Sequence, residues 1–134
     1  PTTISAMAMK VAELDEKKKK KIYSLLSNPE IYKSKITLKM IAKDISIDPA
    51  VLSLFIKQEL GVSFSEHINS LRLDNARSSL LDKRQEHKTM AELSEDIGYQ
   101  SISSFYRNFI EYHNLSPLKW KEQTTATTDK NKNS

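Results

Sequence analysis

TLKMIAKDISIDPAVLSLFIKQELG, at residues 37–61, decides the fold together with a second stretch, TMAELSEDIGYQSISSFYRNFIEY, at residues 89–112. Each stretch begins with a Thr that suits a helix N-cap and continues through a short helix, a turn, a polar cap and a second helix. Aligning Thr37 with Thr89 superimposes the two patterns, with one extra residue needed in the second copy. The aligned pairs are Ile41 and Leu93, Ala42 and Ser94, Ile45 and Ile97, Ser46 and Gly98, Ile47 and Tyr99, and Leu52 and Phe105. Two such helix-turn-helix patterns predict a chain that reads two successive major grooves of DNA.

The composition favours an all-α fold. The chain has 134 residues with two Gly and four Pro, and no alternating apolar run marks a sheet. Apolar residues instead recur at intervals of three and four, as in Leu38, Ile41 and Ile45. We therefore predict about seven helices, arranged as two helix-turn-helix subdomains joined by a long linker helix.

The predicted organisation has three parts. These are an N-terminal linker with a basic helix at residues 1–30, a double helix-turn-helix domain at 31–122, and a disordered polar tail at 123–134. Within the domain the ranges are 37–61 for the first motif, 65–82 for the linker helix and 89–113 for the second motif.

Capping residues predict where the helices begin and end. We predict a first helix from Val11 to Ser27. It ends there because Asn28 precedes Pro29, and a residue before Pro disfavours the helical region. Asp48-Pro49 suits the start of the helix that Gly61 ends. Thr37 precedes a helix at 38–45, and Thr89 precedes a helix that ends at Gly98. Ser101 precedes a helix that ends near His113-Asn114, and Ser116-Pro117 precede a last short helix that carries Trp120. Trp120 and Tyr112 are expected in the core.

Several classes of site have no support in the sequence. There is no Cys, and His67, His87 and His113 lack metal-ligand spacing. No Gly-rich phosphate loop and no paired nucleophile and base are present. We therefore expect no enzyme activity, cofactor, metal or small-molecule ligand.

Location is inferred from the same kind of evidence. No apolar run approaches the ~18 residues of a membrane span, and no signal peptide is visible. The sequence begins at Pro1, which we interpret as a piece cut from a longer protein. We expect the cytoplasm, the alternative being a membrane-anchored protein with this domain on the cytoplasmic side.

The positive charge lies outside the two motifs. The net charge is +4, and residues 1–35 hold eight Lys against four acidic residues. Residues 36–62 hold three basic and three acidic residues, and residues 87–122 hold four and five. A DNA-binding protein usually gathers cations around its recognition helices, so this distribution argues against strong binding by charge alone.

The second motif and the residues after it, IGYQSISSFYRNFIEYHNLSPLKW, resemble the DNA-binding domain of the AraC/XylS family of bacterial transcription regulators. The matching positions are Ile97, Gly98, Tyr99, Ser101, Phe105, Arg107, Phe109, Ser116, Pro117 and Trp120. The linker matches at Phe64, Ile68, Asn69, Arg72, Leu73, Ala76, Leu80 and Leu81. The resemblance covers about residues 31–122 and implies a seven-helix domain whose two recognition helices enter major grooves ~34 Å apart on one face of DNA. It also implies a separate sensor or dimerisation domain, with homodimers formed only through that missing upstream part.

The chain departs from the family pattern in five places. Leu54 and Ile110 stand where Arg and Lys are usual, Ile102 replaces a polar residue, and Ser46 and Asn114 replace Gly. The first three weaken the expected DNA contact, whereas the two turn changes concern only the backbone.

Helix geometry and the family pattern indicate the same outward faces. The candidate base contacts are Ala50, Ser53, Leu54, Ile102, Ser103, Tyr106 and Arg107. The candidate phosphate contacts are Thr37, Lys39, Lys57, Thr89, Ser101 and Ser104. Arg107 is the leading candidate because Arg pairs bidentately with guanine; the alternatives are a phosphate contact and a structural pairing with Glu95.

Three other assignments stay open. The first recognition helix either reads bases or only lies against the DNA backbone or a partner. Arg72 either bridges the two subdomains or contacts DNA. Lys17–Lys21 form either a solvated face or a patch for phosphate, a partner or a membrane surface.

The sequence predicts a sequence-specific DNA-binding domain with double-stranded DNA as partner and RNA polymerase as a second partner. The alternative is a protein-interaction module of the same fold, with apolar outward residues Leu54, Ile102 and Ile110 in place of DNA contacts.

Overall fold

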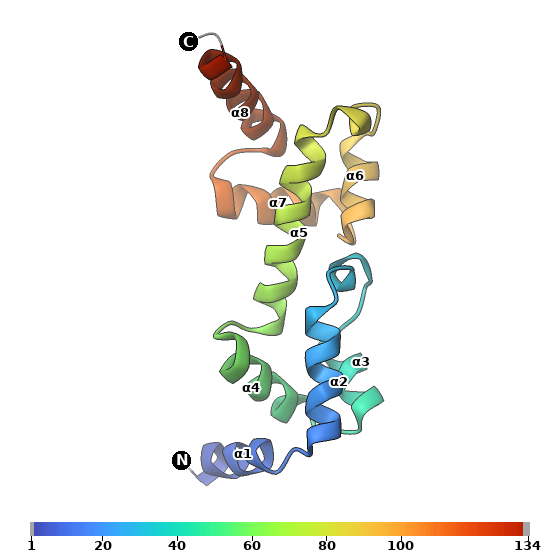
Figure 1. Cartoon of the computed structure of the whole chain (residues 1–134), viewed down its shortest axis with the longest axis vertical. Coiled ribbons are helices and arrows are strands. Elements are labelled where there is room, and N and C mark those ends of the chain that lie inside the picture. Colours follow the sequence, from blue (N-terminus) through green and yellow to red (C-terminus); the bar gives the residue numbers. More distant parts are fainter. Residues whose placement is uncertain (1, 133–134) are drawn as a thin grey trace. The chain divides into compact units, whose positions relative to one another are not determined.

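The structure is a computed structural model that describes the backbone of residues 2–132 and the side chains of residues 6–127. All regular structure in this part of the chain is helical (Figure 1). The α-helices are α1 (Thr2–Ala12), α2 (Glu16–Ser27), α3 (Leu38–Ile45), α4 (Pro49–Leu60), α5 (Phe64–Leu81), α6 (Met90–Ile97), α7 (Ile102–His113) and α8 (Pro117–Lys132), and the 3-10 helices are η1 (Ile31–Lys33) and η2 (Lys83–Gln85). The all-α prediction is confirmed. No helix within the described range is both long and apolar enough to cross a bilayer.

The chain divides into two compact units, Pro1–Ile68 and Asn69–Ser134, and the boundary falls inside α5. The first unit holds the helix-turn-helix of α3 and α4. The second unit holds the helix-turn-helix of α6 and α7.

The predicted capping residues mark the ends of the central helices. The Thr37 hydroxyl accepts a hydrogen bond from the Met40 amide at 3.2 Å, and the Asp48 carboxylate accepts one from the Ala50 amide at 2.8 Å. Gly61 ends α4 in the left-handed region, with φ of 76°. These bonds satisfy amides that a helix start leaves without intrahelical partners, so the predicted boundaries of α3 and α4 are confirmed.

The first unit is built around the inner face of α4. Leu52 and Ile56 are fully buried, and Phe55 packs its ring 5.8 Å from that of Tyr23. The other buried apolar residues of this unit are Val11, Ile22, Leu26, Ile31, Tyr32, Ile41, Ala42, Ile45, Val51, Phe64 and Ile68. Leu52, Phe55 and Ile56 therefore form the inward side of α4.

The N-terminal part differs from its prediction. The sequence predicts one helix from Val11 to Ser27, but the structure ends α1 at Ala12 and starts α2 at Glu16. Asp15 causes the break, because its extended backbone lets its carboxylate accept a hydrogen bond from the Lys18 amide at 2.8 Å. The stretch predicted to be a linker thus forms most of α1, which packs against α4.

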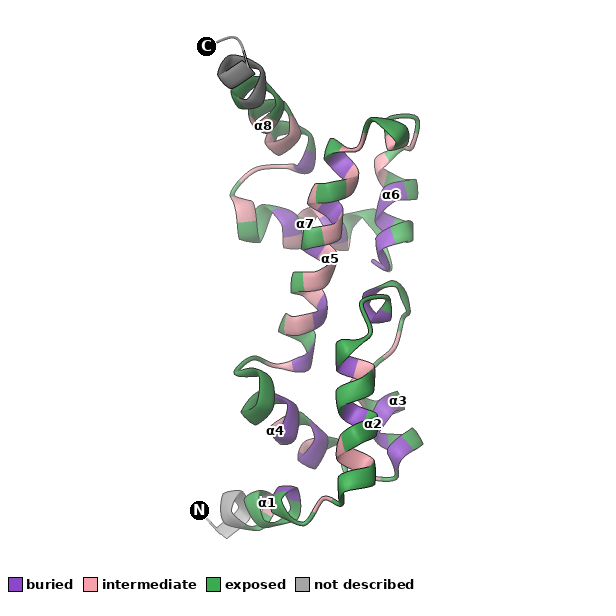
Figure 2. Ribbon diagram, in the orientation of Figure 1, coloured by how far each residue is buried: buried purple, intermediate pink, exposed green. Residues whose placement is uncertain are grey.

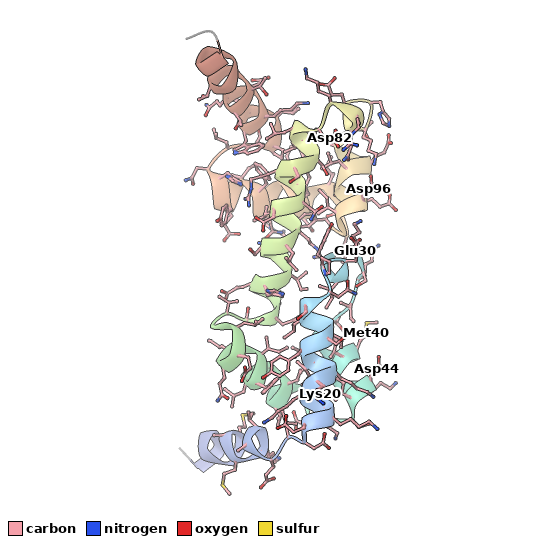
Figure 3. The ribbon with its side chains drawn as sticks, in the orientation of Figure 1. Lys20, Glu30, Met40, Asp44, Asp82 and Asp96 are labelled. Carbon is pink, nitrogen blue, oxygen red and sulfur yellow. The ribbon has the colours of Figure 1, made fainter. Side chains whose placement is uncertain are left out.

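The run of five Lys on α2 has mixed surroundings. Lys18 donates from Nζ to the carbonyl of Ser46 at 3.2 Å, where the last turn of α3 exposes partial negative charge. Lys19 pairs with Glu16 at 3.7 Å, whereas Lys20 is exposed (Figure 3). Part of the run therefore stabilises the first unit, and the rest is a solvated face.

The second unit is packed around aromatic residues of α7. Phe105 and Phe109 are fully buried, as predicted, with ring centroids 5.9 Å apart. The other buried residues are Leu73, Ala76, Leu80, Leu93, Ser94, Ile97, Gly98, Tyr99 and Pro117. In the connector after α5, Lys88 Nζ lies 2.6 Å from the Asp96 carboxylate (Figure 3).

Two aromatic residues differ from the core prediction. Trp120 is only half-buried, with its ring 5.8 Å from that of Phe109. The prediction for Tyr112 is wrong, because Tyr112 is 66% exposed and its ring contacts the Arg77 guanidinium at 5.7 Å. Tyr112 lies in the last turn of α7, where a cation rather than an apolar side chain stands opposite its ring.

The C-terminal segment also differs. The sequence predicts disorder from residue 123, but α8 continues through Lys132. Neither Gly nor Pro interrupts the sequence after Pro117, so nothing in the backbone ends the helix. Residues 133–134 lie outside the described residues.

Both turns pass through the left-handed region at one residue. Ser46 has φ of 63° and Gly98 has φ of 102°. In each turn the next amide reaches back to the helix, from Ile47 to Ala42 O at 3.0 Å and from Tyr99 to Ser94 O at 3.1 Å. This arrangement satisfies carbonyls at the end of the first helix and sets the direction in which the chain leaves it.

We expect Ser46→Gly to stabilise the protein. A side chain in the left-handed conformation costs roughly 1–2 kcal/mol, part of which the greater freedom of Gly in the unfolded chain offsets, leaving a gain of about 1 kcal/mol. Urea unfolding measures the change. Gly98→Ala is the reciprocal variant and should lower stability; a loss of stability in Ser46→Gly would contradict the assignment of strain to this residue.

We also expect stability to fall in mild acid through His113. Arg77 donates to His113 Nε2 at 3.1 Å, and burial together with the Arg77 charge lowers the pKa of His113 from its ordinary value near 6.5. Below about pH 6.5, His113 takes up a proton more readily in the unfolded chain than in the folded chain. The contribution of His113 to the free energy of unfolding is therefore constant above this pH. It decreases as the pH falls from there to the lowered pKa of His113 in the folded chain.

The measurement is urea unfolding across the range from weakly acidic to neutral pH. His113→Gln should remove part of the acid decrease, since Gln accepts a hydrogen bond without titrating. His87→Gln, at an exposed site, is the matched control. Equal pH profiles for His113→Gln and the parent chain would show that the Arg77 contact does not hold His113 neutral.

Candidate nucleic-acid interface

The outward face of α4 is small and weakly charged. Ser53 and Lys57 are exposed, whereas Ala50 and Leu54 are half-buried. Lys57 and Glu59 are the only charged residues of the helix, so α4 has no net charge. Helix periodicity puts the four predicted contact residues of α4 on one side, opposite its buried residues. Figure 2 shows that α4 carries buried, half-buried and exposed residues.

The outward face of α7 combines one cation with apolar and hydroxyl groups. Ile102 is 42% exposed, and Ser103 and Arg107 are also exposed. Tyr106 is half-buried, and its ring meets that of Phe105 at 5.8 Å. This face offers hydroxyl groups, methyl groups and a guanidinium, which are the groups that contact base edges in a major groove.

Arg107 has no hydrogen bond or ion pair with any described residue. The predicted alternative of a structural pairing with Glu95 is therefore absent from this structure. The guanidinium keeps its five donors for a ligand, in a fork that matches guanine or a phosphate.

The start of α7 is fixed by polar contacts, of which the one from Ser94 is partly buried. Ser94, buried in α6, donates from its hydroxyl to the carbonyl of Ser101 at 3.3 Å. The Ser101 hydroxyl accepts a hydrogen bond from the Ser104 amide at 3.1 Å and lies 3.0 Å from the Ser104 hydroxyl. The small side chain at position 94 is what allows α6 to approach the N-terminus of α7.

Tyr99 joins the second turn to α5. Its hydroxyl donates to the Asn69 side-chain carbonyl at 3.0 Å, and the Arg72 guanidinium lies 5.4 Å from its ring centroid. Burial raises the pKa of Tyr99 to about 12 and lowers the pKa of Arg72. Tyr99 is therefore a neutral donor, and Arg72 is half-buried against its ring.

Sequence reasoning gave these positioning residues no role of their own. Asn69 entered only as part of the family pattern. Tyr99 entered as part of that pattern and as the position aligned with Ile47, and Ser94 only as the position aligned with Ala42. The sequence feature that could have predicted the role of Ser94 is a small polar residue in the middle of a short helix.

The predicted phosphate contacts divide into two kinds. The Thr89 hydroxyl accepts a hydrogen bond from the Glu92 amide at 3.1 Å and donates to the Glu92 carboxylate at 3.2 Å, so α6 begins beside a negative charge. The first turn of α3 carries no acid, and Lys39 there is exposed. An anion is therefore favoured at the start of α3 over the start of α6. Ser104 is half-buried.

The described residues contain no group of side chains that could hold a metal ion. The cations among the predicted contact residues are Lys57 on α4, Arg107 on α7 and Lys39 in the first turn of α3.

The comparisons with known proteins agree with this geometry. A family model described as a helix-turn-helix domain matches residues 41–123. The transcriptional regulator YtdP of Bacillus subtilis is 32% identical over 92 residues, which are 69% of this chain and 12% of that protein. YobQ of the same organism is 30% identical over 96 residues, which are 72% of this chain and 38% of that protein. The chain thus spans well under half the length of these relatives.

A solved structure shares the fold. The DNA-binding domain of AdpA, solved in complex with a target DNA, superimposes with a TM-score of 0.69 at 12% identity. The match covers 79% of this chain and 94% of that one.

Proposed function

The chain belongs to the AraC-type helix-turn-helix family, and from this membership we propose that it is the sequence-specific DNA-binding domain of a transcription regulator. Each helix-turn-helix unit presents one recognition helix, α4 or α7, to a major groove of double-stranded DNA. The relatives YtdP and YobQ are named as transcriptional regulators of the same type, which supports this assignment.

The exposed guanidinium of Arg107 is the observation that carries the proposal. It lies on the outward face of α7 and has no partner among the described residues. Ser94 and Tyr99 hold the start of that helix in place through hydrogen bonds. An exposed Arg without a protein partner, on a face with hydroxyl groups, suits direct pairing with a guanine edge.

The first unit contributes fewer polar contacts. Ser53 is exposed and suits a base edge, Lys57 is exposed and suits a phosphate, and the methyl groups of Ala50 and Leu54 suit thymine. The exposed apolar residues Ile102 and Ile110 of α7 also suit contacts with thymine methyl groups. The exposure of these two apolar side chains can therefore be explained without a protein partner. The alternative of a protein-interaction module is not favoured.

The wider setting is also a proposal. We expect the chain to act in the cytoplasm, to receive its dimerisation from another part of a longer protein, and to meet RNA polymerase at its DNA site. Dimerisation would add to affinity, because a second linked site binds at a high effective concentration.

Arg107→Ala should remove preference for the target sequence. The test takes duplexes that the chain selects from a random library and compares them with scrambled duplexes by fluorescence anisotropy. Losing a bidentate Arg–guanine pair costs about 1–3 kcal/mol, or roughly 5- to 150-fold in affinity for the selected duplex.

Lys119→Ala is the matched control, because it removes one exposed cation from α8 of the same unit. It should leave the preference intact. Equal weak binding of the parent chain to selected and scrambled duplexes would sink the proposed function. Preference that survives Arg107→Ala would instead assign Arg107 to a phosphate.

The salt dependence of binding should be shallow. The predicted cations of the interface are Lys39, Lys57 and Arg107, and neutralising about three phosphates gives a slope of log K against log salt of about −3. Anisotropy titrations at several salt concentrations measure the slope. A value near −10 would mean that many more cations contact the DNA than these two helix-turn-helix units supply.

A further inference from the structure

The N-terminal helix α1 packs against α4, the first recognition helix. Val11 of α1 is 7% exposed and Val51 of α4 is 4% exposed. A shallow groove of about 260 Å³ separates the end of α1 from the start of α4, with Lys10 and Leu14 on one side and Val51 on the other. The two helices therefore share an apolar contact inside the first unit.

Helix geometry places this contact beside the predicted DNA-reading face. Val51 and Leu54 are three residues apart and are therefore neighbours on the surface of α4, whereas Ala50 lies about 100° around the helix from Val51. Ala50 and Leu54 are half-buried, while Ser53 and Lys57 are exposed. The contact with α1 therefore lies beside the predicted contact face of α4, on the edge nearest Val51.

A major groove does not admit a second helix at this position. The groove is about 12 Å wide, and a helix with its side chains is about 10–12 Å across. When α4 enters the groove, a helix packed on its flank meets the sugar-phosphate wall.

The sequence of α1 does not suit that wall. Lys10 is its only charged residue, and Met9 on the same helix is 63% exposed. Beyond Lys10, none of its side chains carries a charge that could pair with a phosphate.

α1 packs against α4 but buries few of its described side chains. Among them only Val11 is buried, and Met7 is half-buried. The helix also lies outside residues 41–123, which match the family model. Leaving α4 would therefore expose little apolar side-chain surface of the described part of α1.

We propose that α1 is a displaceable cover of the first recognition helix, which undocks from α4 when the first unit binds DNA. The proposal rests on the proposed DNA-binding function. DNA and α1 compete for adjacent parts of one helix, so whatever holds α1 in place lowers affinity for DNA, and by linkage DNA loosens α1.

The test uses the absence of Cys from the chain. A single thiol at Val11→Cys reports docking through its rate of reaction with a maleimide, and Met9→Cys on the same helix is the exposed control. In the free chain Val11→Cys should react about tenfold or more slowly than Met9→Cys, because burial protects it. Adding the selected duplex at saturation should raise the Val11→Cys rate toward that of Met9→Cys.

A second variant measures the coupling directly. Val11→Asp places a charge in the contact and should raise affinity for the selected duplex by about 5- to 150-fold, the usual range of coupling between two sites. Met9→Asp makes the same charge change on the exposed side and should give no increase. Circular dichroism checks that the rest of the unit stays helical, and the Cys variant still decides the matter if Val11→Asp unfolds it.

The outcomes separate this proposal from the proposed function. Failure to select any duplex would overturn both. Selective binding with a Val11→Cys rate that stays low would overturn the cover alone and would show that α1 remains docked on DNA. Selective binding together with a raised reaction rate of Val11→Cys would support the proposal that α1 is a displaceable cover.

Discussion

One left-handed residue in each turn determines where the recognition helices point. Ser46 in the first unit and Gly98 in the second turn the chain through a conformation that most side chains avoid. The amide that follows each of them bonds back to the preceding helix, at Ala42 O and Ser94 O. Because one backbone conformation ends the first helix and begins the approach to the second, the burial of α4 and α7 and the exposure of their outer faces both depend on it.

The two units meet this constraint differently. In the second unit Gly adopts the conformation without strain, and Tyr99 then fixes the turn to α5 by a hydrogen bond to Asn69. In the first unit Ser46 carries the strain of a side chain, and Lys18 compensates in part by donating to the Ser46 carbonyl. The Lys run of α2 is therefore partly a structural feature of this turn, which its charge pattern alone does not reveal.

Sequence reasoning succeeded where a single residue marks a boundary. Thr37, Asp48, Gly61 and Ser101 fix helix ends through local bonds, so α3, α4 and α7 could be predicted closely.

Prediction from sequence failed where tertiary packing determines the position of a residue. Periodicity gives the direction of a side chain around a helix but not whether anything lies opposite, which is why Tyr112 shares an angle with Phe105 yet is exposed. The placement of α1 on α4 depends on contacts between helices about 40 residues apart in the chain, which no local pattern encodes.

The chemistry of the outer faces limits how the chain can discriminate DNA sequences. Their few cations provide little counterion release, so we expect weak non-specific binding. The thymine contacts proposed for the methyl groups of Ala50, Leu54 and Ile102 instead require a recognition helix that lies deep in the groove. Deep insertion of α4 into the major groove requires that the sides of its contact face are open. The affinity of the first unit for DNA therefore depends on the position of α1 more than it would if Lys and Arg side chains carried the binding. A weakly charged reading face and a covering helix therefore act in the same direction, since both make tight binding conditional on full insertion of α4.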